Sequence, residues 1–361
     1  MKILNRWETL FLLIMTLPIM GHVVILLLLL DVAGRDSWIS VILSLPIAFL
    51  FAWWIYRLRT KYAGYNFPDI IKAIVGKGMG WAILLLFTLY FLCLSAFSIA
   101  ALADLTRVAF LPETPVLAIS SWAMLFCFYA AKQGVKKISH IACVLGVIAM
   151  FTGHSITLLS TPKKDFFNIT PILEYGWIPV LIGTLILSSI WVELAFLLLV
   201  PIKWASGSKM FLFWSIGILL NAIMMISTST GAIMVFGAEQ ADNMVYPALE
   251  VVRLIRLGFV DRFDVYAMIL MSFGCYIRGS LYLRVAFDLV YPVVKKETQQ
   301  KNWLLFGTTV LVGYLAYYLS AVHLRFEQFT IYYSYSIVLL PLPLLLLVAS
   351  WFRKRGAVTG T

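Results

Sequence analysis

Long apolar stretches follow one another along the whole chain, and short polar segments rich in Lys and Arg separate them. A helix that rises about 1.5 Å per residue needs about 20 apolar residues to cross the roughly 30 Å hydrocarbon core of a bilayer. Strands of outer-membrane barrels instead alternate apolar and polar residues over about ten positions. The pattern predicts ten membrane-spanning helices, at residues 9–30, 38–56, 81–106, 114–131, 138–160, 177–200, 210–237, 263–287, 303–321 and 330–352.

The composition agrees with a multispanning membrane protein. The chain has 361 residues, of which 62% are apolar and 12% charged, and its mean hydropathy is +0.94. Water-soluble domains have roughly 45–50% apolar and about 25% charged residues. We therefore expect a single all-α transmembrane domain over residues 1–361, with no room for a separate soluble domain.

The net charge of +11 has to be interpreted by position, because Lys and Arg collect on the cytoplasmic loops of membrane proteins. If the N-terminus is cytoplasmic, the predicted inside segments hold 19 Lys and Arg residues and the predicted outside segments hold eight. This bias predicts that both termini are cytoplasmic. The inside basic residues are spread over six separate segments, whereas nucleic-acid binding needs one basic patch.

Two of the polar segments have helical patterns of their own. Residues 67–76 begin with a Phe-Pro pair and end with Gly, which predicts a short amphipathic helix at the cytoplasmic interface. Residues 247–257 begin with Pro247 and are followed by Gly258, and Glu250 and Arg253 have the spacing of an ion pair. This pattern predicts an external helix that covers the bundle, although an ordinary interfacial helix without a gating function would look the same.

Ten spans divide into two groups of five, and an odd number per group gives the groups opposite orientations in the membrane, as an inverted repeat requires. The first repeat would cover about residues 9–160 and the second about residues 177–352. In folds of this kind the ligand binds where the first and sixth spans unwind. Matching interruptions in spans 1 and 6 are therefore the sequence feature to look for.

Both spans contain such a feature. In span 1, Pro18 lacks a backbone donor and Gly21 loosens the next turn. In span 6, Ser188 and Ser189 interrupt an apolar run. At about 1.5 Å per residue, Pro18 lies about 14 Å from the cytoplasmic end of its span and Ser188 about 16 Å from the outer end of its own. Pro18 could also be a simple kink, and the serines could bond back to their own helix.

Signatures of enzymes are absent from the sequence, which has no Gly-x-Ser-x-Gly, His-Glu-x-x-His, Walker A or Gly-x-Gly-x-x-Gly motif. The four histidines lie on four different segments. No span carries the stripe of polar residues expected of a channel pore. We therefore expect neither an enzyme nor a metal site, cofactor or ion channel.

Two charged residues lie well inside the predicted spans. Glu193 is 16 residues into span 6 and Arg278 is 15 residues into span 8, both counted from the outside, so they lie about 24 and 22 Å deep. A charge at membrane depth costs several kcal/mol unless it is paired or reaches water. The matched depths predict an ion pair or water-linked contact that acts as a structural or gating pair. Alternatively, each side chain reaches a polar neighbour or the cytoplasmic surface separately.

Four segments together resemble a known family. They are WVELAFLLLVP at residues 191–201, YPALEVVRLI at 246–255, DRFD at 261–264 and RGSLYLR at 278–284. In these segments, in length and in number of spans, the chain resembles the B subunit of the spore germinant receptors of Bacillus. The resemblance implies the LeuT-like five-plus-five inverted repeat, with broken helices 1 and 6, of the amino acid, polyamine and organocation transporter superfamily. Such families often have a lysine in the middle of span 8, where this chain has Arg278.

The resemblance also implies a function: a nutrient sensor that binds a small amino acid-like germinant between spans 1, 3, 6 and 8. Its implied partners are the receptor A subunit and a C-subunit lipoprotein, in the inner membrane of the spore. An amino acid and proton symporter of the same fold is the alternative, and a purely structural subunit is a third. The residues expected to bind the ligand are Pro18, Met20, Gly21, His22, Tyr90, Phe97, Ser98, Ser188, Ser189 and Trp191.

Overall fold

The structure, a computed structural model, describes residues 3–18, 21, 24–202, 209–256, 262–294 and 298–352. Among these residues the fold is all helical, apart from one isolated bridge in which the Leu4 amide donates to the Pro201 carbonyl at 2.7 Å. The first half contains α1 (Arg6–Thr16), α2 (Ile25–Ala33), α3 (Ser37–Lys61), α4 (Phe67–Val75), α5 (Lys77–Ala109), α6 (Val116–Gln133) and α7 (Val135–Ser160). The second half contains α8 (Trp177–Val192), α9 (Phe196–Leu199), α10 (Met210–Phe236), α11 (Ala238–Asp242), α12 (Pro247–Arg253), α13 (Asp264–Val294), α14 (Thr298–Ser320), α15 (His323–Ser334) and α16 (Leu342–Phe352).

Eight helical stretches of the described residues are long and apolar enough to cross a membrane. They are Ile25–Lys61, Lys77–Ala109, Val116–Gln133, Val135–Lys163, Trp177–Leu199, Met210–Phe236, Gln300–Ser320 and His323–Phe352. The prediction of an all-helical membrane protein is confirmed. The count of ten, which adds a span containing α1 and one formed by α13, stays a prediction.

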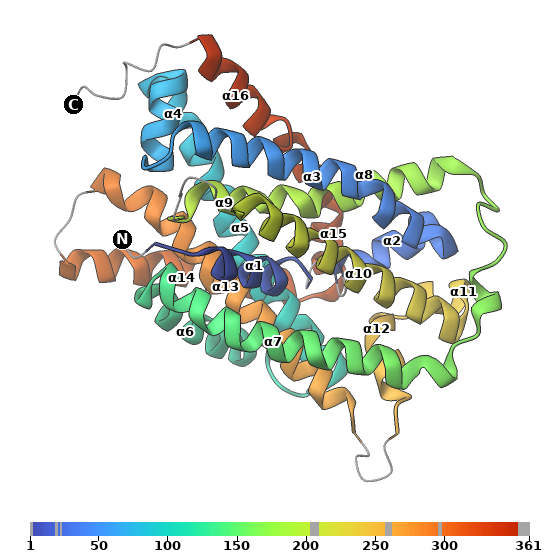
Figure 1. Cartoon of the computed structure of the whole chain (residues 1–361). Helices are drawn as coiled ribbons and strands as arrows, with labels where there is room; N and C mark the ends of the chain where they lie inside the picture. Colours follow the sequence, from blue (N-terminus) through green and yellow to red (C-terminus); the bar gives the residue numbers. More distant parts are fainter. Residues whose placement is uncertain are drawn as a thin grey trace.

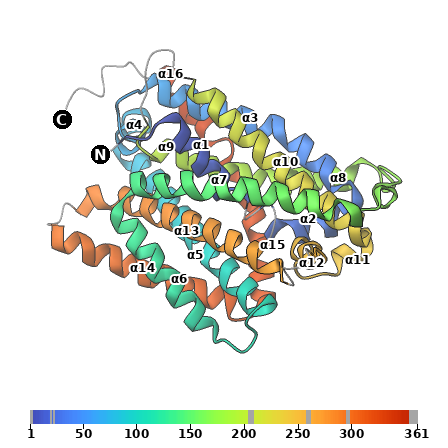
Figure 2. The same ribbon diagram turned by 60° about the horizontal axis from the view of Figure 1, so that its bottom comes forward.

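Figures 1 and 2 show the long helices running in roughly the same direction through one bundle, with α4 and α16 at one end and α11 and α12 at the other. Small residues let pairs of helices approach closely. The Ser95 hydroxyl of α5 donates to the Gly279 carbonyl of α13 at 2.8 Å, and the Ser40 hydroxyl of α3 donates to the Val180 carbonyl of α8 at 2.9 Å. A Cβ atom on Gly183 would lie 2.6 Å from the Ser40 hydroxyl.

The two short helices predicted between spans are present. The helix expected at residues 67–76 is α4, which ends at Gly76, a residue with a φ of 87° that favours glycine. The helix expected at residues 247–257 is α12, which ends earlier, at Arg253, because the next two amides bond three residues back instead of four. Residue 257 lies outside the described residues, and the external position of this helix stays a prediction. The Arg253 guanidinium pairs with Glu250 at 2.6 Å and donates to the Ala109 carbonyl at 2.7 Å. The bond to Ala109 attaches the end of α12 to α5.

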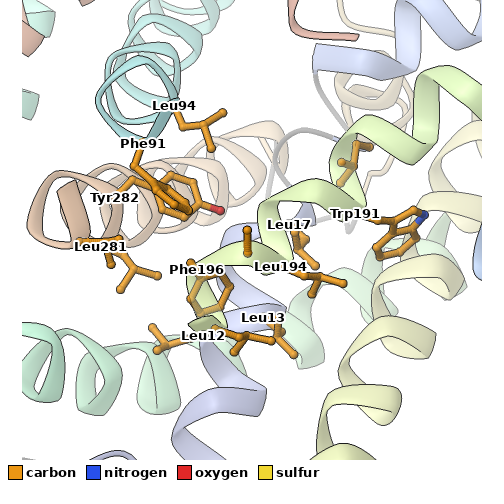
Figure 3. Close-up of a cluster of buried hydrophobic side chains, with 14 of the residues drawn as sticks. Leu12, Leu13, Leu17, Phe91, Leu94, Trp191, Leu194, Phe196, Leu281 and Tyr282 are labelled. Carbon is orange, nitrogen blue, oxygen red and sulfur yellow. The ribbon is translucent and has the colours of Figure 1, made fainter. Parts of the chain in front are cut away.

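Buried side chains from α1, α5, α8, α9 and α13 converge on one hydrophobic cluster at the centre of the bundle (Figure 3). Leu13 and Leu17 come from the N-terminal segment, Phe91 from α5, and Leu194 and Phe196 from the region where α8 gives way to α9. All five are fully buried. This core surrounds the breaks in the helices described below.

Candidate functional site

The N-terminal helix changes its geometry after Thr16, and we call the segment between α1 and α2 the interruption. Helix α1 ends at Thr16 and α2 begins at Ile25, with no side-chain cap on its first turn. In this segment Pro18 is α-helical, Gly21 and Val24 have π-helical backbone, and the Gly21 amide donates to the Leu17 carbonyl at 3.5 Å. Two predicted ligand-binding residues of this stretch, Met20 and His22, lie outside the described residues. Single π-helical turns inside α-helices are frequent at functional sites, so this segment is a candidate for ligand binding.

A second change of helical geometry follows α8. This helix ends at Val192, a 3-10 turn covers Glu193–Ala195, and α9 continues over Phe196–Leu199. Helix α9 then ends at Val200, whose backbone is extended. The turn carries the Glu193 side chain into the bundle.

The Glu193 carboxylate and the Arg278 guanidinium form a two-point ion pair. Arg278 Nε donates to Glu193 Oε2 at 3.0 Å, and Nη2 donates to Oε1 at 2.5 Å. Tyr282 of α13 donates its hydroxyl to Oε2 at 2.6 Å, and Tyr333 of α15 donates to Oε1 at 2.5 Å. Both charged side chains are 0% exposed. Glu193 and Arg278, which the sequence places at matching depths, are therefore in direct contact.

The remaining Arg278 nitrogen connects the pair to α5. Arg278 Nη1 donates to the Ser98 hydroxyl at 2.6 Å and to the Leu94 carbonyl at 3.5 Å. The network therefore joins α5, α13, α15 and the turn after α8. Removing one partner of a buried ion pair leaves an uncompensated charge, so the network holds these four elements in one arrangement.

The other predicted residues of span 6 have partners inside the protein. The Ser188 hydroxyl donates to the Thr184 carbonyl at 2.7 Å, and the Ser189 hydroxyl donates to the Ile186 carbonyl at 2.6 Å. Both bonds run back along α8, as the alternative interpretation of these serines expected. The Trp191 indole donates to the Ser44 hydroxyl of α3 at 3.0 Å.

The aromatic residues predicted on span 3 pack against other rings. The Phe97 centroid lies 5.0 Å from that of Phe329 and 5.7 Å from that of Tyr333. The Tyr90 centroid lies 5.2 Å from that of Phe91. These rings occupy the space between spans 3, 6 and 10 in this conformation. Direct ligand contact by the residues predicted between spans 1, 3, 6 and 8 stays a prediction.

A cavity of about 270 Å³ adjoins the interruption of α1, on the side where α7, α10 and α13 lie. Pro18 is the predicted ligand-binding residue that lines it. Gly153 of α7, Gly231 of α10 and Gly274 of α13 form parts of its walls, and Val251 of α12 covers it. Sequence reasoning missed the walls from α7 and α10. The glycines within these two apolar spans were the signal available.

A second cluster lies at the end of the bundle where α12 is found. The Asp104 carboxylate of α5, 0% exposed, accepts bonds from the Tyr246 hydroxyl at 2.5 Å and from His323 Nδ1 at 2.7 Å. His323 Nε2 lies 3.1 Å from the Glu327 carboxylate. Tyr246 precedes α12 directly, so this cluster connects the α12 segment to α5 and α15. Sequence reasoning treated the histidines as isolated, although Glu327 stands four residues after His323.

An open cavity of about 330 Å³ lies next to this cluster. Tyr246, His323 and Glu327 line it together with Asp31 of α2 and Asp242 of α11. Burial, and then the neighbouring Asp31 carboxylate, raise the pKa of Asp242 above its usual value. The cavity reaches from α2 to α15.

Replacing Tyr246 by Phe tests the cluster. The substitution removes a donor from the buried Asp104 carboxylate, so we expect a loss of about 1–3 kcal/mol of stability. The measurement is thermal unfolding of the purified protein in detergent. Tyr332→Phe is the matched control, because Tyr332 is 65% exposed and should change nothing. Equal melting temperatures for both variants would contradict the role given to the Tyr246 hydroxyl.

Comparison with known proteins identifies the family. A family model described as spore germination protein matches residues 4–323. The chain belongs to the spore germination protein family. This result confirms the resemblance to the B subunits of germinant receptors.

Three relatives match this chain over most of its length. Spore germination protein XB of Bacillus anthracis is 27% identical over 97% of this chain and 98% of its own. Spore germination protein YndE of Bacillus subtilis (strain 168) is 26% identical over 89% of this chain and 88% of its own. Spore germination protein KB of the same organism is 21% identical over 78% of this chain and 77% of its own.

Solved structures with a similar fold are those of transporters. A Na+-coupled sialic acid symporter in a substrate-bound, outward-open state matches with a TM-score of 0.68 at 11% identity, over 96% of this chain and 78% of its own. Mhp1, a nucleobase-cation-symport-1 family transporter with bromovinylhydantoin bound, matches with a TM-score of 0.65 at 11% identity, over 95% of this chain and 77% of its own. This spore germination protein therefore has a LeuT-like transporter fold.

Proposed function

We propose that this chain is the nutrient-sensing B subunit of a spore germinant receptor, and that it binds a small amino acid-like germinant in a transporter-like pocket to trigger germination. The observation that carries the proposal is the interruption that follows α1 at Pro18, in a transporter fold within a spore germination family. A transporter fold supplies a ligand site between helices that can change position. A sensor uses the same change of position as its signal.

The proposal includes ten spans in a single domain, arranged as two inverted repeats with broken helices 1 and 6. The repeats would cover about residues 9–160 and 177–352. The break between α1 and α2 and the turn after α8 support it. Both termini would be on the spore core side, the side of α4, with α12 on the outside. The position of α4 and α16 at the end of the bundle opposite α12 agrees with this topology.

Within this fold we place the germinant at the interruption of α1. A zwitterionic ligand would have its carboxylate near the backbone donors of residues 18–22 and its ammonium near the carbonyls of residues 188–190. Helix ends carry partial charges that suit these groups without a charged side chain. The Glu193 and Arg278 charges are already fully paired with each other and with hydroxyl groups, which is consistent with a structural or gating role for them.

The proposed partners are the receptor A subunit and the C-subunit lipoprotein, in the inner membrane of the spore. The relatives named spore germination proteins support a place in the same process. The alternative function, an amino acid and proton symporter, is favoured by one observation: the two solved structures named above belong to symporters. The two functions differ in whether the bound molecule crosses the membrane.

Uptake and binding measurements separate these functions. The purified chain is reconstituted alone into proteoliposomes, and radiolabelled amino acids are tested for saturable binding and for accumulation inside. We expect binding without accumulation for the sensor, because signalling needs only a change of conformation. Accumulation driven by a proton gradient would establish the transporter instead. Absence of binding to every germinant of the parent spore would contradict both.

A disulfide between α2 and α12 tests whether α12 has to move for the receptor to respond. Leu30, near Val32 at the outer end of α2, and Val251 of α12 belong to one buried cluster. We expect a cysteine pair at Leu30 and Val251 to block germination once oxidised, and a reductant to restore it. The two single-cysteine variants are the controls. A normal response of the oxidised double variant would show that α12 is only a cover.

A further inference from the structure

The 270 Å³ cavity between α1, α7, α10 and α13 has the properties of a second ligand site, which adjoins the germinant site proposed above and shares Pro18 with it. It is roughly twice the size of an engineered cavity of about 150 Å³ that holds benzene. A Cβ atom on Gly153 would lie 3.8 Å from Met224 Cε, and one on Gly231 would lie 3.9 Å from Lys164 Cε, with no closer neighbour. The glycines on α7 and α10 therefore keep this space open.

The hydroxyl groups of the cavity wall already have partners. The Thr157 and Ser227 hydroxyls lie 2.8 Å apart and bond to each other. The Ser160 hydroxyl donates to the Thr157 carbonyl at 3.0 Å, and the Thr228 hydroxyl donates to the Met224 carbonyl at 2.9 Å. No buried side-chain polar atom among the described lining residues lacks a partner. Since the buried polar side chains of the wall already have hydrogen-bond partners, the deep part of the cavity suits an aliphatic group.

Lys164 gives the cavity a charged end. Its ammonium donates to the Thr157 carbonyl at 3.1 Å, near the end of α7. An ammonium has three donors, and no carboxylate in the described part of the chain lies within ion-pair distance of this one. Burial lowers the pKa of Lys164 below its usual value. An anionic group would supply the missing counter-charge.

The cavity is reached from the side of the bundle. His154 of α7 and Ile223 of α10 line it and are also exposed, Ile223 by 53%. Both residues lie on apolar helices that can cross the membrane. The opening between α7 and α10, which run beside each other in Figures 1 and 2, therefore faces the lipid phase.

We propose that this cavity binds a single-chain amphiphile with a carboxylate head, which enters from the membrane between α7 and α10. The carboxylate pairs with Lys164, and a chain of about eight carbons fits in the apolar part, because the cavity is roughly twice as large as one that holds the six carbons of benzene. Met15 and Pro18 of the N-terminal segment and Val251 of α12 line the same space. A bound chain therefore contacts both segments and stabilises the arrangement seen here.

Charge selectivity is the first test. Binding of octanoate, octan-1-ol and octylamine to the purified full chain in lipid nanodiscs is measured by titration calorimetry, with empty nanodiscs subtracted. We expect saturable binding of octanoate and about tenfold weaker binding of octanol, because octanol loses the charge-assisted bond to Lys164. We expect no binding of octylamine, because its ammonium would be repelled by the Lys164 ammonium. Lys164→Gln should weaken octanoate binding about tenfold and leave octanol unchanged. Lys163→Gln, at the neighbouring exposed lysine, is the matched control and should change nothing.

Filling the cavity is the second test. Gly153→Leu and Gly231→Leu each add a Cβ at ordinary van der Waals distance, 3.8 Å from Met224 Cε and 3.9 Å from Lys164 Cε. Since both glycines line the cavity, both variants should fold and both should abolish octanoate binding. Gly307→Leu on α14, where nothing lies within 4 Å, is the control that keeps binding. Equal octanoate binding by wild type and by whichever filling variant folds would overturn the proposal. Saturable binding that does not depend on Lys164 would overturn it too. Neither outcome depends on a germination response, so a failure here is distinct from a failure of the proposed function.

Discussion

Glu193→Gln and Arg278→Met should each strongly reduce the stability and the amount of the folded protein, whereas the double variant should recover a substantial part of both. The carboxylate and the guanidinium are 0% exposed and bonded at two points. Removing one partner leaves a buried charge, at a cost of about 3–5 kcal/mol, against a total stability of about 5–15 kcal/mol for a typical domain. Removing both leaves only neutral groups, among them the hydroxyls of Tyr282 and Tyr333.

The measurement is the amount of full-length protein in spore membranes, together with its melting temperature after purification. Glu250→Gln is the matched control, because the Glu250–Arg253 pair is about one-third exposed and such pairs contribute about 0–1 kcal/mol. A double variant as defective as the sum of the two single variants would show that the residues do not act as a pair. If the double variant assembles but does not respond to nutrients, the pair has a gating role in addition to its structural one.

Gly21→Leu should abolish the nutrient response and leave the protein assembled. A Cβ atom on Gly21 would lie 2.5 Å from Cε of Met225 and 2.7 Å from its Cγ. Because Cγ, Sδ and Cε all lie within 2.9 Å, the whole Met225 side chain of α10 has to adopt another rotamer. Methionine is unbranched and adaptable, so we expect the fold to survive. The added side chain then fills the space beside the interruption of α1 where we place the germinant.

The dose response of germination and the amount of protein in the membrane are measured together. Met225→Ala in the Gly21→Leu background removes the neighbour and should restore part of the response. Gly307→Leu, which meets nothing within 4 Å, is the control for an added side chain on a helix of the bundle. A normal dose response of Gly21→Leu would place the germinant elsewhere.

Several features of this protein could be predicted because they follow from local sequence. The membrane class follows from apolar stretches long enough to cross a bilayer, since an apolar helix of that length is stable in lipid wherever it lies in the fold. Helix α4 was predicted from its Phe-Pro start and its glycine end. The contact between Glu193 and Arg278 was predicted from equal depth, because two opposite charges deep in a membrane protein gain most by meeting.

Other features depended on which helices become neighbours, and hydrophobic patterns carry no such information. The wall of the cavity from α7 and α10 was missed, because a glycine such as Gly153 in an apolar span fits a cavity and a close helix contact equally well. The Asp104 cluster was missed as well, since Tyr246 and His323 are far from Asp104 in the sequence. Sequence by itself determined that the chain is a bundle of membrane helices with one deep charge pair. Only the tertiary structure decided which spans line the cavity and which polar side chains meet in the Asp104 cluster. Those contacts arise from helix packing over long sequence separations.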